Sequence, residues 1–134
     1  MSWELRDAVD EDHRFIVPYW RAGYEHAPEV QKCERTWYRV QMSRRIAWCL
    51  EHGTTRVACL EDDPDAILGF ACVSKPGTVL HYAAVRKEAR GVGIARALLA
   101  EHPRLVSYSH RPFHAPKFLD GLAYTPFIFG PESP

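Results

Sequence analysis

Two glycines and two arginines in one short segment are the residues of this chain whose types and spacing indicate a binding site most directly. Arg90, Gly91, Gly93 and Arg96 fall in a short polar segment between an apolar stretch and an amphipathic stretch. A helix that begins on a glycine-rich turn presents free backbone N–H groups and the positive end of its dipole. Glycine permits a tight backbone and adds no side-chain bulk. The segment therefore predicts an anion site, and the anion that backbone donors usually hold is a phosphate or pyrophosphate.

Other glycine-dependent sites fit this segment poorly. The spacing Gly91-x-Gly93-x-x-Arg96 lacks the third glycine of the dinucleotide-binding fingerprint, and no early βαβ pattern surrounds it. The sequence contains no GKS or GKT, which excludes a Walker loop. It also contains no GxSxG elbow and no HExxH zinc motif.

Hydrophobic periodicity and turn residues predict the elements that position this segment. The order is β-α-α-β-β-β-α-β-α-β, with Pro18 expected to kink or shorten the first helix. The predicted strands are residues 3–9, 55–60, 67–74, 79–85, 105–109 and 124–129, and the predicted helices after the first are residues 33–52, 93–102 and 114–122.

The motif Arg90-x-x-Gly93-x-Ala95, between a strand and a helix, resembles the acyl-CoA pyrophosphate loop of the GNAT (GCN5-related) N-acetyltransferase superfamily, R/Q-x-x-G-x-G/A. The element order resembles the GNAT fold over nearly the whole chain, with the last helix and strands trimmed. The phrases FIVPYW, LHYAAV and GVGIARALL also resemble short GNAT-like proteins of bacteriophages. The resemblance implies an α/β (α+β) GNAT fold in one domain over residues 1–134. Its centre is a mixed, mostly antiparallel sheet flanked by helices.

The resemblance implies acetyl-CoA (CoA) as the cofactor and assigns its binding residues. The backbone of the strand before the turn would pair with the pantetheine amides, and the turn would give amide N–H groups to the pyrophosphate. The two arginines would add positive charge. The cofactor-binding residues implied in this way are Ala83, Ala84, Val85, Arg90, Gly91, Val92, Gly93, Ile94, Ala95 and Arg96.

The implied activity is transfer of an acetyl group to a primary amine by direct attack, with no covalent intermediate on the protein. His81 stands where the family often has a glutamate base, and strand alternation predicts that it shares a face with Val85. The tyrosine that often serves as the acid is missing, because Phe118 or Leu119 occupies its place. We therefore expect Tyr108 or His110 to substitute as the acid.

The residues leave three functions open: an N-acetyltransferase acting on a small amine or protein amino group, a phage GNAT directed to nucleic acid or a nucleobase, and a catalytically degenerate GNAT fold that binds a partner. Arginines at 35, 39, 44 and 45 on the second helix could meet phosphates, although a solvated face is the simpler interpretation. Residues 107–114 and Tyr24, Glu25 and His26 are expected near the acceptor.

Composition sets wider bounds. At 134 residues one domain is expected. Lys+Arg and Asp+Glu are both 17, which disfavours a large electrostatic footprint for nucleic acid. No signal-peptide h-region and no run near the roughly 20 apolar residues of a membrane helix is present. The four cysteines lack CxxC spacing, so we expect no metal, buried thiols and a cytoplasmic location. A strand over residues 127–129 could pair two copies as a homodimer.

Overall fold

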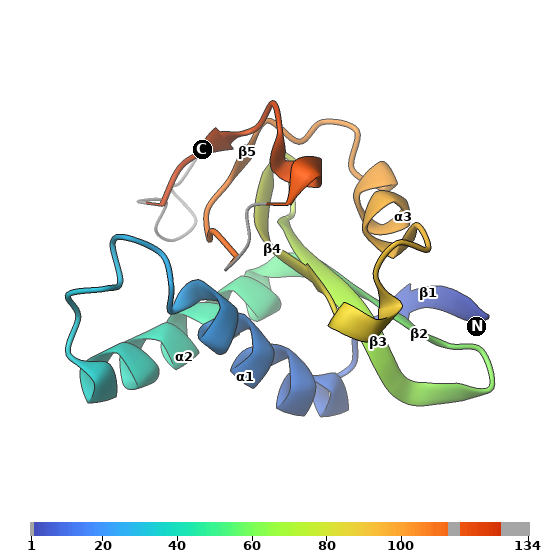
Figure 1. Ribbon diagram of the computed structural model, residues 1–134, viewed down its shortest axis with the longest axis horizontal. Helices are drawn as coiled ribbons and strands as arrows, with labels where there is room; N and C mark the ends of the chain where they lie inside the picture. The colour runs from blue at the N-terminus through green and yellow to red at the C-terminus, as the bar shows by residue number, and fades with distance from the viewer. Residues whose placement is uncertain (1, 113–115, 127–134) are drawn as a thin grey trace.

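The fold is built on a six-stranded sheet (Figure 1). The structure, a computed structural model, describes residues 2–112 and 116–126. The strands of the sheet lie side by side in the order in which they occur along the chain. The elements are β1 (Trp3–Asp7), η1 (Asp10–Asp12), α1 (His13–Tyr24), α2 (Arg35–His52), β2 (Gly53–Leu60), β3 (Asp63–Ser74), β4 (Val79–Val85), η2 (Lys87–Ala89), α3 (Ile94–Ala100), β5 (Ser107–Tyr108), η3 (Lys117–Leu119) and β6 (Ala123–Tyr124).

The sheet is mixed, as predicted. Strands β1 to β4 pair antiparallel, whereas β5 pairs parallel to both β4 and β6. The pairing of β4 with β5 covers only two residues of each strand and ends at Leu80. On its other side β4 pairs with β3 as far as Val85. Among the described residues, most of β4 therefore has a strand neighbour on one edge only.

A β-bulge interrupts β4 where the pairing with β5 ends. Cys72 of β3 lies opposite Tyr82, but the next residue, Val73, lies opposite Leu80. His81 is therefore the extra residue in β4. Such a bulge bends the strand and changes which side chains share a face. Leu80 and Ala83 consequently belong to one core cluster, while Tyr82 belongs to the other.

Helices cover both faces of the sheet and give two hydrophobic clusters. Trp20 of α1 and Ile46 of α2 pack with Phe70 of β3 on one face. Ile94 and Leu98 of α3 pack on the other face. Among the helices of residues 2–112 and 116–126, none is both long enough and apolar enough to cross a membrane.

Pro18 does not shorten the first helix. Helix α1 continues six residues beyond it to Tyr24, and the N–H of Glu25 closes the last turn on the carbonyl of Arg21 at 3.1 Å. Ile16, Trp20 and Tyr24 are buried at helical spacing on both sides of the proline. Their tertiary packing holds the helix despite the hydrogen bond that proline removes.

The C-terminal elements are shorter than the sequence predicts. Only the 3₁₀ turn η3 forms in the described part of the expected helix over residues 114–122, between Pro116 and Gly121. Proline lacks an N–H, and Gly121 has a φ of +87°, so both residues favour a turn over a helix. The end of the predicted last strand, residues 127–129, lies outside the described residues, as do residues 114 and 115.

Candidate active site

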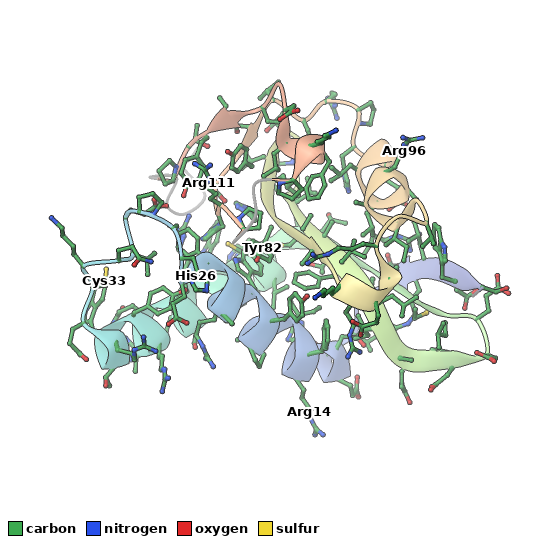
Figure 2. The ribbon with its side chains drawn as sticks, viewed as in Figure 1. Arg14, His26, Cys33, Tyr82, Arg96 and Arg111 are labelled. Carbon is green, nitrogen blue, oxygen red and sulfur yellow. The ribbon has the colours of Figure 1, made fainter. Side chains whose placement is uncertain are left out.

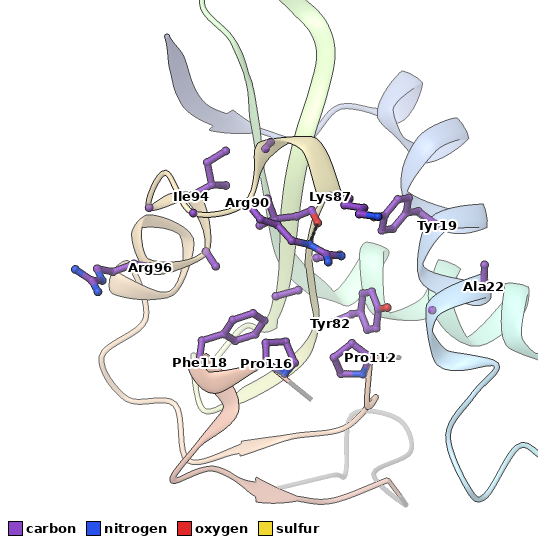
Figure 3. Close-up of a pocket in the computed structure, with 18 of the residues that line it drawn as sticks. Tyr19, Ala22, Tyr82, Lys87, Arg90, Ile94, Arg96, Pro112, Pro116 and Phe118 are labelled. Atoms are coloured by element: carbon purple, nitrogen blue, oxygen red, sulfur yellow. Dashed lines mark hydrogen bonds between the residues drawn. The ribbon is translucent and has the colours of Figure 1, made fainter. Parts of the chain in front are cut away.

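A cleft of about 840 Å³ opens along the free edge of β4 (Figure 3). The C-terminal half of β4 forms one wall, and the segment from η2 to the start of α3 continues it. Residues of α1 stand opposite, and Pro112, Pro116 and Phe118 complete the lining. These three walls come from segments that lie far apart in the sequence.

Two left-handed glycines shape the loop at one end of this cleft. Gly91 has a φ of +84° and Gly93 a φ of +90°, values that residues with a side chain rarely adopt. A Cβ at either position would meet no heavy atom within 4 Å. Gly93 is the N-cap of α3, and its carbonyl accepts from the N–H of Ala97 at 3.0 Å. The loop therefore lies open toward the cleft at both glycines.

Nine of the ten residues predicted to bind the cofactor line this cleft. The exception is Val92, whose side chain is exposed. The nine are Ala83, Ala84, Val85, Arg90, Gly91, Gly93, Ile94, Ala95 and Arg96. The residues predicted from the short pattern around Arg90 and Gly93 thus form a continuous surface, and their binding role stays a prediction.

The backbone of β4 faces the cleft where its pairing with β5 ends. The carbonyl of His81 accepts a side-chain hydrogen bond from His110 Nδ1 at 3.0 Å, and the carbonyl of Val85 accepts one from Arg90 Nε at 3.0 Å. Residues two apart in a strand direct their backbone groups to the same edge. Ala83 therefore presents its backbone to this edge between them. A strand edge of this kind can accept an extended ligand as a further strand.

Basic side chains stand along the cleft. Lys87, Arg90 and Arg96 line it together with His26, and no Asp or Glu does so among the described residues. In Figure 3, Lys87 and Arg90 reach over the cleft on the side of Tyr19, whereas Arg96 extends outward from α3. The local charge is positive although the chain as a whole is neutral. The cleft therefore favours an anionic ligand.

Two of the predicted catalytic residues form a buried polar network behind the cleft. Arg45 Nε donates to His110 Nε2 at 3.3 Å, and Ser109 Oγ lies 2.8 Å from His110 Nδ1 and 2.9 Å from His81 Nδ1. Burial lowers the pKa of His81 to about 4, and Arg45 adds to this effect. Burial and the same arginine place the pKa of His110 well below its usual range. Both imidazoles are therefore neutral at pH 7.

The predicted orientation of His81 is wrong because of the bulge. Its ring contacts Ser109 and His110, and His110 packs edge-on against Trp20 and Tyr24 of α1. His81 thus faces the α1 side, whereas Val85 packs with the α3 cluster. Neither histidine lines the cleft.

Tyr108, the remaining predicted catalytic residue, is buried as well. Its ring stacks on Tyr124 with centroids 4.9 Å apart, in the cluster on the α3 face. It does not line the cleft. Phe118, by contrast, does line it, and neither Phe118 nor Leu119, the two candidates for the family's tyrosine position, carries a hydroxyl. The catalytic roles of His81, Tyr108 and His110 stay predictions.

The expected acceptor loop is only partly at the cleft. His26 lines it, but Tyr24 is buried and its hydroxyl donates to Glu29 at 2.7 Å. Glu25 instead forms an ion pair with Arg35 at 3.1 Å. The arginine face of α2 is also not wholly solvated, because Arg45 is half-buried. Among the described residues, no three His, Cys, Asp or Glu side chains gather as a metal site would require.

Sequence reasoning missed Tyr82 and Gly23. Tyr82, labelled in Figure 2, is buried and contributes to the cleft wall, and Gly23 of α1 stands against its hydroxyl. The signal was present in β4, where an aromatic residue directly precedes the small residues Ala83 and Ala84. Tyr82 and Ala84 pack in the same cluster, as strand alternation predicts.

Comparison with known protein families shows which family this chain belongs to. The model of the acetyltransferase (GNAT) family matches residues 8–101, which is more than half of the chain. The chain therefore belongs to the GNAT acetyltransferase family. A search of curated proteins found no significantly similar sequence.

Solved structures share the fold. YjaB from Escherichia coli, in its apo form, has a TM-score of 0.53 and 22% identity over 76% of this chain and 65% of its own. A histone acetyltransferase HPA2-related protein from Corynebacterium glutamicum has a TM-score of 0.55 and 20% identity over 75% of this chain and 70% of its own. A GCN5-related N-acetyltransferase from Rhodopseudomonas palustris has a TM-score of 0.54 and 18% identity over 75% and 63%. The chain thus spans slightly less than two thirds of the length of two of these three structures.

Proposed function

We propose that this chain is an N-acetyltransferase that moves an acetyl group from acetyl-CoA to a primary amine by direct attack. The observation that carries the proposal is the cleft itself, because one continuous surface combines a free strand edge with an open glycine loop. The chain's place in the GNAT family supports the same activity. The bacteriophage resemblance, the cytoplasmic location and the homodimer are sequence predictions that we keep as part of the proposal.

The residues present fit an acyl-CoA. The spaces that a Cβ would fill at Gly91 and Gly93 are empty, which leaves room for a phosphate against the backbone. Arg90 and Lys87 supply positive charge on the cleft wall. The small side chains of Ala83 and Ala84 let an extended pantetheine arm approach the main chain of β4. The bound group would supply a thioester, whose carbonyl carbon is the electrophile.

The chain's own residues would then act through position and hydrogen bonding. A backbone N–H of β4 near Ala83 would stabilise negative charge on the carbonyl oxygen, as preorganised donors do in other acyl transfers. Just beyond Leu80, where the pairing of β4 with β5 ends, side chains of the network of His81, Ser109 and His110 bond to β4 in place of a neighbouring strand. We propose that this network holds β4 and β5 apart and so keeps the edge free for the ligand.

Thiol release from acetyl-CoA tests the activity. The protein is mixed with acetyl-CoA and a panel of small amines, amino acids and lysine-containing peptides, and free CoA is measured with a thiol reagent. Release that requires both the protein and an amine supports the proposal. Saturable binding of acetyl-CoA without release for any amine would favour the alternative of a GNAT fold that only binds.

A further inference from the structure

The hydroxyl of Tyr82 has no hydrogen-bond partner among the described residues, although only 2% of the residue is exposed. Buried tyrosine hydroxyls usually have a partner. The ring is held firmly: it stacks on Trp20 at 5.3 Å with an interplanar angle of 9°, and it packs against Phe70 at 6.0 Å. A fixed donor with no acceptor in the described part of the chain points to a ligand.

This hydroxyl is open to the cleft. Three fully buried side-chain atoms lack a hydrogen-bond partner in the described chain: Arg6 Nε, Trp20 Nε1 and Thr55 Oγ1. Tyr82 Oη is not among them, so this oxygen is not fully buried. Tyr82 also contributes to the cleft wall. In Figure 3 its ring stands in the cleft between Arg90 and Pro112, with the oxygen directed toward α1.

Gly23 makes the space that this hydroxyl occupies. A Cβ at position 23 would lie 1.8 Å from Tyr82 Oη and 3.0 Å from the ring carbon that bears it. Glycine weakens a helix interior relative to alanine. Helix α1 therefore places a stacking ring at Trp20 and a gap at Gly23 on either side of the same tyrosine.

The position along β4 indicates which part of an acyl-CoA would reach Tyr82. The phosphates would lie at the loop around Gly93, and the arm would run back along β4 from Val85 toward Ala83. At roughly 3.3 Å per residue, the strand covers about 10 Å from Val85 to Tyr82. An acyl-CoA bound in this way would bring the thioester end of its arm toward this part of β4.

We infer that Tyr82 is a catalytic residue whose hydroxyl donates a hydrogen bond to the thioester sulfur. The inference rests on the proposed function. When the amine nitrogen bonds to the carbonyl carbon, the C–S bond breaks and its electron pair moves to sulfur. Tyr82 stabilises that charge and keeps its own proton. The amine's proton goes to solvent, and the CoA thiolate is protonated by solvent.

The ionisation of Tyr82 suits a donor that keeps its proton. Burial raises the pKa of this tyrosine, and the neighbouring tyrosines at 19 and 38 act in the same direction. Arg90 opposes them more weakly. The hydroxyl is therefore protonated at every pH at which the protein would work.

The test compares two tyrosine-to-phenylalanine variants. Tyr82→Phe keeps the ring and removes a hydroxyl that no described residue bonds, so we expect the native urea midpoint and a 10- to 100-fold lower turnover. Tyr38→Phe is the matched control. Its hydroxyl donates to the carbonyl of Arg21 at 2.6 Å behind the cleft, so we expect a lower urea midpoint and native turnover.

A second readout does not depend on turnover. CoA binding is followed by calorimetry from pH 7 to pH 10, and thiolate formation by ultraviolet absorbance. A donor at the sulfur favours the thiolate, so bound CoA should ionise at lower pH in the native protein than in Tyr82→Phe. Gly23→Ala, which displaces the hydroxyl, should resemble Tyr82→Phe in this titration.

The outcomes separate this inference from the proposed function. Native turnover and an unchanged thiol titration in Tyr82→Phe would overturn the role of Tyr82 while leaving the acetyltransferase intact. A folded native protein that binds no CoA at any pH would overturn both. Lower turnover with a native thiol titration would also refute the contact with sulfur, because the hydroxyl would then act elsewhere.

Discussion

Replacing Gly93 by alanine separates the cost of backbone geometry from the cost of lost ligand binding. Gly93 has a φ of +90°, and an added Cβ would meet no heavy atom within 4 Å. The steric term is therefore absent, and only the left-handed backbone penalises the variant. That penalty is about 1–2 kcal/mol for a residue with a side chain, which we expect as the loss in free energy of unfolding by urea.

Gly77→Ala is the matched control. Gly77 has a φ of +80° and equally open space, but it lies in the turn between β3 and β4, away from the cleft. Both variants should lose the same stability. Only Gly93→Ala should also lose affinity for acetyl-CoA, by tenfold or more in calorimetry, because its Cβ occupies the space proposed for a phosphate. Equal affinity in the two variants would refute the binding loop, and an undiminished stability of Gly93→Ala would refute the backbone geometry.

Three further predictions concern stability and reactivity. Tyr124→Phe removes a hydroxyl that donates to Glu29, so the free energy of unfolding of this variant should fall by about 1–2 kcal/mol. Native stability would show that this hydrogen bond does not stabilise the fold. The buried His81 and His110 have lowered pKa values, so the unfolded chain binds protons that the folded chain does not. The contribution of these two histidines to the free energy of unfolding should be complete above about pH 6.5. It should fall by about 1.4 kcal/mol per pH unit per histidine as the pH drops toward the pKa values of the folded state. Urea unfolding at pH 7 and pH 5.5 checks this, and equal stability at both would contradict the buried network. Cys33 is the exposed cysteine, so a thiol reagent should modify one thiol quickly in the folded protein and all four after unfolding; a second fast thiol would contradict the packing.

The loop around Gly93 could be predicted because its signals are local. An apolar strand, two glycines and an amphipathic helix each leave a pattern within a few residues, and those patterns agree with one another. The sheet and the three helices followed from the same kind of pattern. The trimmed C-terminal elements were less predictable, because Pro116 and Gly121 compete with a weak helical periodicity.

The interior of the site could not be predicted because it depends on tertiary pairing. A single bulge at His81 changes the face on which its side chain lies. His110 is buried because aromatic residues of α1, far away in the sequence, pack against it. The exposure of Tyr82 to the cleft likewise depends on the space left at Gly23.

Binding of acetyl-CoA is the most direct test of the central claim. The folded native protein and a Gly93→Glu variant are titrated with acetyl-CoA in a calorimeter. The glutamate would put a side chain and a negative charge where a phosphate is proposed to lie. We expect saturable binding at one site by the native protein and none by the variant. No binding by the native protein, or equal binding by both, would contradict the proposed cofactor loop.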